Sequence, residues 1–116
     1  MLSHTTEHGV LVITVDRDPG IDGRAALSTR MTHLIEAHVP TPVVVDLTDP
    51  AASDATVSAV LRAHQLCSRH GVSMSVVTRS APLRRLLGER ADAAYPRLAL
   101  YTRMDTAVAA CFTAAA

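Results

Sequence analysis

The chain has no lysine and no tryptophan, and its aromatic residues are two tyrosines and one phenylalanine. The absence of lysine excludes a Walker-type phosphate loop and a Schiff-base enzyme. Eleven arginines balance eleven acidic residues, so the net charge is zero. A neutral domain lacks the basic surface that binds nucleic acid or an anionic membrane. With 48% hydrophobic residues and so few aromatics, we expect an aliphatic core.

Long apolar runs are also absent. None approaches the roughly 20 residues that a membrane span needs, and no signal peptide is recognisable, so we expect a cytoplasmic protein without direct membrane insertion. The cysteines are few, only Cys67 and Cys111, and both stand in apolar helical contexts. A disulfide between them is conceivable, but we expect two reduced, buried thiols.

Motifs that carry catalysis or bind metals are missing as well. The chain has no G-x-S-x-G, no H-E-x-x-H and no C-x-x-C. The acidic loop at 16–22 is not a calcium loop, because Ile21 stands where glycine is needed and Leu27 offers no carboxylate. His64 lies on an apolar stripe without a second ligand four residues on, so we expect a half-buried, hydrogen-bonded core residue. A solvated helix face explains the arginine group better than an anion site (Arg79, Arg84, Arg85, Arg90). We therefore predict no enzyme, no cofactor and no metal.

Strand and helix patterns alternate along the whole chain. The β-branched run Val43–Val45 fits a strand that is buried on both faces. We expect strands at 10–15, 43–47, 72–78 and 97–101, an edge strand or frayed start at 1–8, and helices at 24–38, 55–69, 80–88 and from 102 onward. This order predicts a single α/β domain over residues 1–116, with its core at about 8–112. Its mixed sheet should have four to five strands, an antiparallel N-terminal part and helices packed against it.

The helix expected at 55–69 carries more apolar surface than a helix covered by a sheet alone requires. Ser53 or Asp54 offers an N-cap oxygen at its start. Its main apolar stripe holds Val57, Val60, Leu61, His64 and Cys67. A further sector of small apolar residues holds Ala55, Ala59, Ala63 and Leu66. Either a neighbouring helix or a partner protein covers this sector. We expect it to lie partly exposed near a partner surface.

Several segments, taken in order, are similar to the motifs of one known domain family. Ile21-Asp22 is similar to the end of the family's G-x-[IL]-D, although Gly20 stands one residue too close. The strand at 43–47, VVVDL, is similar to the family's central strand ending in Asp-Leu. Residues 72–87 resemble the strand and short helix that follow, and Tyr95-Pro96 with Asp105–Ala109 resembles the family's ending. Together these segments resemble the STAS domain family of bacterial anti-sigma factor antagonists and sulphate-transporter domains. The resemblance covers roughly residues 8–112 and implies the STAS fold.

In antagonist proteins of this family, a D-S-[ST]-G motif precedes the second helix, and its first serine accepts phosphate from a kinase anti-sigma factor. Asp54 and Thr56 match this motif, but Ala55 stands at the acceptor position and Val57 replaces the glycine. The phosphorylation motif is therefore degenerate. Either the switch is lost, which we favour, or it has moved to a nearby hydroxyl: Thr56, Ser53 or Ser58.

The resemblance implies a regulatory module that binds proteins and has no enzymatic activity of its own. Its implied partner is a kinase-like ATPase of the anti-sigma type in a bacterial cytoplasm, and a homodimer is possible. Taking the resemblance with the extra apolar sector, we expect the partner to contact Asp22, Asp54, Ala55, Thr56, Ala59, Ala63 and Leu66. The alternative is a STAS-type accessory subunit of an ABC-type membrane transport complex.

Overall fold

The computed structural model describes residues 2–48, 53–91 and 98–114. In chain order they form β1 (Leu2–Glu7), β2 (Val10–Val15), α1 (Gly20–His38), β3 (Val43–Leu47), α2 (Asp54–Arg69), β4 (Met74–Val77), α3 (Ala81–Ala91), β5 (Ala99–Tyr101) and α4 (Met104–Ala114). The strands make one sheet in the order β1-β2-β3-β4-β5, with β1 antiparallel to β2 and every other pair parallel. The predicted α/β fold, with a mixed sheet and an antiparallel N-terminal part, is confirmed.

The strand β3 lies at the centre of the sheet, as its β-branched run predicts. Val44 and Val45 are fully buried on opposite faces of the sheet. Val45 stands opposite Ile13 of β2 and Val76 of β4. Three consecutive strands thus supply Val or Ile at one level of the core, where branched side chains pack well on a pleated surface.

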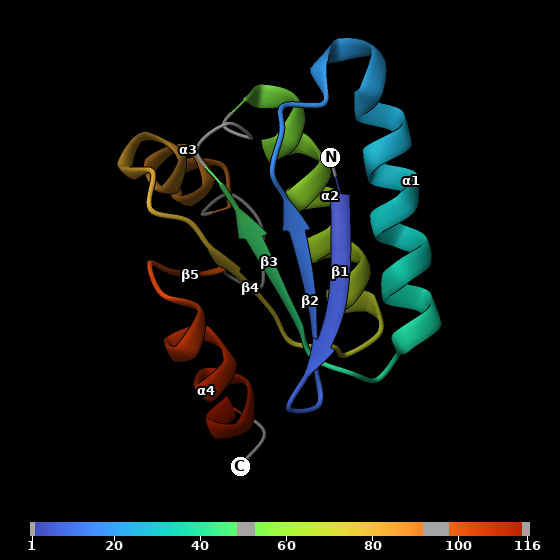
Figure 1. Cartoon of the computed structure of the whole chain (residues 1–116), viewed down its shortest axis with the longest axis vertical. Coiled ribbons are helices and arrows are strands. Elements are labelled where there is room, and N and C mark those ends of the chain that lie inside the picture. Colours follow the sequence, from blue (N-terminus) through green and yellow to red (C-terminus); the bar gives the residue numbers. More distant parts are fainter. Residues whose placement is uncertain (1, 49–52, 92–97, 115–116) are drawn as a thin grey trace.

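Helices cover both faces of the sheet (Figure 1). On one face, α1, α2 and α3 bury their apolar residues against the strands in a large cluster that includes Leu27, Met31, Val57 and Leu87. On the other face, α4 covers a smaller cluster. The three helices α1, α2 and α3 lie on one face because each connects parallel neighbouring strands by a crossover of the same hand. The final helix α4, which connects no strands, is free to take the opposite face.

A two-residue hairpin explains why the polar segment Leu2–Glu7 forms a strand. His8 and Gly9 both have positive φ, at 51° and 78°, the combination that closes tight hairpins with the right-handed twist of the sheet. This turn sets β1 against β2 from Leu2–Val15 to Glu7–Val10. The first strand is therefore paired along its length, and the alternative of a frayed start is wrong.

One predicted helix end is confirmed and another is wrong. Gly71, at φ 67°, ends α2 as predicted: Val72 N donates to the Cys67 carbonyl at 2.8 Å, and Gly71 N donates to the Ser68 carbonyl at 3.2 Å, a Schellman motif. The predicted stop at Gly88 is wrong, because α3 continues to Ala91. A glycine inside a helix costs only about 1 kcal/mol relative to alanine, and burial of Leu87 outweighs that cost.

The helices α1 and α4 begin a few residues away from their predicted starts. α1 begins at Gly20, four residues before the predicted start, and Pro19 stands at its N-cap without a side-chain hydrogen bond. α4 begins at Met104, so Thr102 is not its cap. The Asp105 carboxylate instead accepts a hydrogen bond from Thr106 N at 2.9 Å. Across the described residues, no helix is both long and apolar enough to span a membrane.

Candidate functional site

The carboxyl edge of the parallel strands holds most of the residues that the sequence singles out. Strands β2 to β5 run in the same direction, so the segments that follow them meet at one edge, where the helices α1 to α4 begin (Figure 1). Ligands of open α/β sheets bind outside this edge. The candidate site is the part of this edge at the N-terminus of α2, directly after the central strand.

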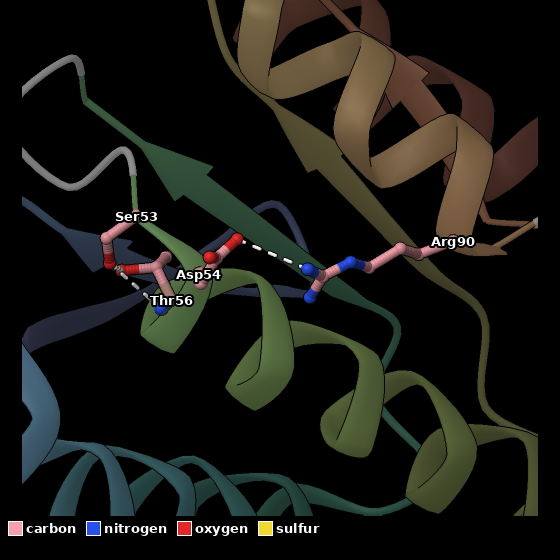
Figure 2. Close-up of polar contacts among 4 residues, drawn as sticks. All are labelled: Ser53, Asp54, Thr56 and Arg90. Atoms are coloured by element: carbon pink, nitrogen blue, oxygen red, sulfur yellow. Dashed lines mark hydrogen bonds and ion pairs between the residues drawn. The ribbon is translucent and has the colours of Figure 1, made fainter.

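Ser53 fixes the start of α2. Its backbone is extended, with φ −158° and ψ 163°, and its Oγ accepts a hydrogen bond from Thr56 N at 3.2 Å. The same hydroxyl donates to Thr56 Oγ1 at 3.2 Å, as Figure 2 shows. Ser53 is thus the N-cap, one of the two residues proposed for that role. A serine cap of this kind stabilises a helix by about 1 kcal/mol relative to alanine.

Asp54 occupies the first helical position and points away from the cap (Figure 2). Its side chain is 80% exposed, and its Oδ1 pairs with Arg90 Nη2 of α3 at 3.2 Å. Such an exposed pair contributes at most about 1 kcal/mol, so a partner's cation can compete for this carboxylate. An acidic group in the first turn is also favoured by the helix dipole.

The structure separates the three candidate phospho-acceptors. Thr56 is fully buried, and its hydroxyl is held by Ser53, so the proposal of Thr56 as an acceptor or partner contact is wrong. Ser53 is half-buried, with its hydroxyl engaged in the cap. Ser58 is half-buried in a shallow cavity of about 380 Å³ between α1 and α2, beside Arg24 and Arg62. No observation tests whether Ser53 or Ser58 accepts phosphate, so a switch moved to one of these hydroxyls stays the alternative to its loss.

The small apolar sector of α2 is part of the core. Ala59, Ala63 and Leu66 are only 1%, 2% and 8% exposed, so the expectation that they lie partly exposed at a partner surface is wrong. Helix α1 packs alongside α2 on the same face of the sheet, as Figure 1 shows. Small side chains allow that close approach. The alternative of a neighbouring helix is therefore confirmed. Of this sector, only Ala55 stays half-exposed.

Asp22 is exposed in the first turn of α1, at the same edge as Asp54. No described contact joins the two carboxylates; the ion pair of Asp54 is with Arg90. The predicted partner contacts that remain accessible are therefore Asp22, Asp54 and Ala55. Tyr95-Pro96, one of the segments that carry the STAS resemblance, lies outside the described residues.

The two cysteines singled out in the sequence are buried, as expected, whereas His64, expected to be half-buried, is buried as well. His64 is 5% exposed, and burial lowers its pKa below the usual 6.5. Burial raises the pKa of the Cys67 thiol to about 11 and also raises that of Cys111. Both cysteines are free thiols. All three side chains therefore favour their neutral forms and act as core residues.

Sequence reasoning missed two features of this edge. It gave no role to Asp46, although a carboxylate that closes a buried β-branched strand is a visible signal. It also missed the contact of Asp54 with Arg90, 36 residues on. No local pattern predicts that contact, since the fold brings α2 and α3 together.

A scan against models of protein families finds no match, and a search of curated proteins finds none either.

Proposed function

We propose that this chain is a protein-binding regulatory module of the anti-sigma factor antagonist type, acting in a bacterial cytoplasm. Its partner is an anti-sigma factor with a kinase-like ATPase fold. The proposal rests on the resemblance to the STAS family at residues 8–112, and the chain has the α/β order of strands and helices that its sequence patterns predict.

The observation that supports the proposal most is the position of Asp54 and Ala55. The buried strand β3 delivers this short segment to the carboxyl edge, and the Ser53 cap holds its backbone in place. Asp54 is exposed and Ala55 is half-exposed. A rigid, accessible helix start loses little entropy when a partner binds it.

The same segment explains why the proposed module lacks a phosphorylation switch. Ala55 has no oxygen to accept phosphate, and the neighbouring Thr56 hydroxyl is buried in the cap. In family members with a serine at this place, phosphate would add a charge of about −1.5 to −2 at the helix start and alter partner binding. Without that acceptor, this chain stays competent to bind at all times.

The test begins with affinity capture of partners from the source organism and their identification by mass spectrometry. The purified anti-sigma factor is then titrated by calorimetry against wild type, Asp54→Arg and Glu36→Arg. Glu36 is the matched control, because it is exposed near the far end of α1, at the opposite edge of the sheet.

Reversing the charge of Asp54 should weaken binding about tenfold, whereas Glu36→Arg should bind like wild type. Circular dichroism checks that both variants are folded. Equal affinity for all three proteins would remove the α2 N-terminus from the interface. Capture of an ABC-type ATPase, with no anti-sigma factor, would overturn the proposal in favour of the accessory subunit of a transport complex.

A further inference from the structure

The sheet has a second feature at its carboxyl edge, on the face covered by α4. After β4 the chain turns to α3 on one face, and after β5 it turns to α4 on the other. The start of α4 and the strand ends thus border a space outside the carboxyl edge of the sheet, where ligands of open α/β sheets bind. In this fold that space lies outside the ends of β3 and β4, beside the segment that leads into α4.

A cleft of about 510 Å³ occupies this place. Its walls come from the ends of β3 and β4 and from the segment that leads into α4: Asp46, Leu47, Thr48, Val77, Thr78, Arg79, Thr102, Arg103, Met104 and Asp105. The volume falls within the range of small-molecule sites. Four of its lining side chains carry charge, two of each sign, so the cleft is neutral overall but strongly polar.

Two of these four charged side chains, Arg103 and Asp105, form an ion pair with each other. Arg103 donates to both carboxylate oxygens of Asp105, from Nε at 3.1 Å and from Nη2 at 2.7 Å. The backbone N–H of Thr106 also donates to this carboxylate at 2.9 Å. A two-pronged pair of this kind holds its geometry. Arg103 and Asp105 thus neutralise each other at the exposed rim of the cleft, so a ligand gains less from either of them than from an unpaired charge.

The other two charges, Asp46 and Arg79, remain available. Asp46 is half-buried at the end of β3, and burial raises the pKa of its carboxyl, while the Arg79 guanidinium partly offsets that rise. Arg79 is exposed at the end of β4. Among the described residues, neither side chain makes a hydrogen bond or a close ion pair. The Asp46 carboxylate therefore has no donor in the described part of the chain and can accept from a cationic group of a ligand, a charge-assisted contact that is stronger than a neutral hydrogen bond.

We propose that this cleft binds a small zwitterion of the amino-acid class, with its ammonium group on Asp46 and its carboxylate on Arg79. A ligand with a single charge would satisfy one of these two groups and leave the other unpaired. A zwitterion pairs both groups and keeps the cleft neutral. This inference is independent of the proposed partner at the α2 N-terminus, since Asp54 and Ala55 do not line the cleft.

The experiment uses the full chain, labelled with ¹⁵N, and follows its backbone amides by NMR. The probes are the standard amino acids, β-alanine and γ-aminobutyrate, each at about 10 mM. For any that binds, the amine without the carboxylate and the acid without the amine are titrated as well. We expect at least one zwitterion to shift the amides of Thr78–Arg79 and Arg103–Asp105 in a saturable manner.

The single-charge analogues should bind about tenfold more weakly, because each lacks one charge-assisted contact. Asp46→Asn and Arg79→Gln should each weaken binding by a similar factor, whereas the control Arg30→Gln, on an exposed face of α1 outside the cleft, should not. Melting temperatures check that all variants fold. Absence of saturable shifts with every zwitterion would overturn the proposal. Equal affinity for a single-charge analogue, or for Asp46→Asn, would overturn it as well.

Discussion

Placing an arginine at Ala63 tests whether the small apolar sector of α2 is core or surface. Ala63 is 2% exposed and belongs to the large cluster between the sheet and the helices α1, α2 and α3. In the substitution Ala63→Arg, a long charged side chain must occupy space that now holds one methyl group. Other residues of this cluster, such as Met31 and Ile35 of α1, are themselves fully buried.

The cost has two parts. Overpacking of a filled core costs about 1–3 kcal/mol, and burial of an unpaired charge costs several kcal/mol more. We therefore expect a loss of at least about 3 kcal/mol from a total stability of about 5–15 kcal/mol. For a chain of this size such a loss lowers the melting temperature by about 10 °C or more.

The assay is thermal and urea unfolding followed by circular dichroism. The matched control is Gln65→Arg, which adds the same charge two positions later on the exposed side of α2. A surface change of this kind usually stays within about 0.5 kcal/mol. If Ala63→Arg melted within about 2 °C of Gln65→Arg, the sector would be accessible and the packing of α1 against α2 would be refuted.

Two further predictions concern the cap and the buried histidine. Ser53→Ala removes the N-cap acceptor of α2 and leaves the Thr56 hydroxyl without its donor, so urea unfolding should show a loss of about 1 kcal/mol in the free energy of unfolding. The control Ser73→Ala, in an exposed loop, should lose almost none. Equal losses of stability in the two variants would contradict the cap. Burial lowers the folded-state pKa of His64 below 6.5, so between that lowered pKa and 6.5 the unfolded chain binds more protons, and stability is lost as the pH falls through this window. Melting curves from pH 7.5 downward should show this loss in wild type and a smaller one in His64→Leu; parallel curves for the two proteins would contradict a buried neutral imidazole.

The central strands could be predicted because the residues that favour a strand follow one another directly in the sequence. The run Val43–Leu47 has no polar alternation before Asp46, so only a strand covered on both faces suits it. The strand Leu2–Glu7 carries no such signal, since most of its side chains are polar and exposed. It forms because the turn at His8 and Gly9 sets it beside Val10–Val15.

The candidate site was only partly predictable. Small residues such as Ala59 and Ala63 suit a close helix contact and a small protein interface equally well, so their spacing cannot decide between the two. The structure shows that these residues belong to a helix contact, because α1 packs along α2. The hydrogen bond from Thr56 N to Ser53 had a local signal, because these two residues stand at the spacing of a helix cap. The contact between Asp54 and Arg90 and the nearness of Asp46 to Arg79 depend on tertiary structure.

The central claim is a partner-binding module without a phosphorylation switch, and intact-mass spectrometry tests it most directly. Three proteins are each incubated with the purified kinase-type anti-sigma factor and ATP: wild type, Ala55→Ser and the control Ala37→Ser. The control adds a hydroxyl at an exposed position near the C-terminus of α1. We predict no phosphate on wild type or Ala37→Ser, and one phosphate at position 55 of Ala55→Ser, which has a hydroxyl at the half-exposed second residue of α2. Stoichiometric phosphate on wild-type Ser53 or Ser58 would contradict the claim, because the switch would then have moved instead of being lost.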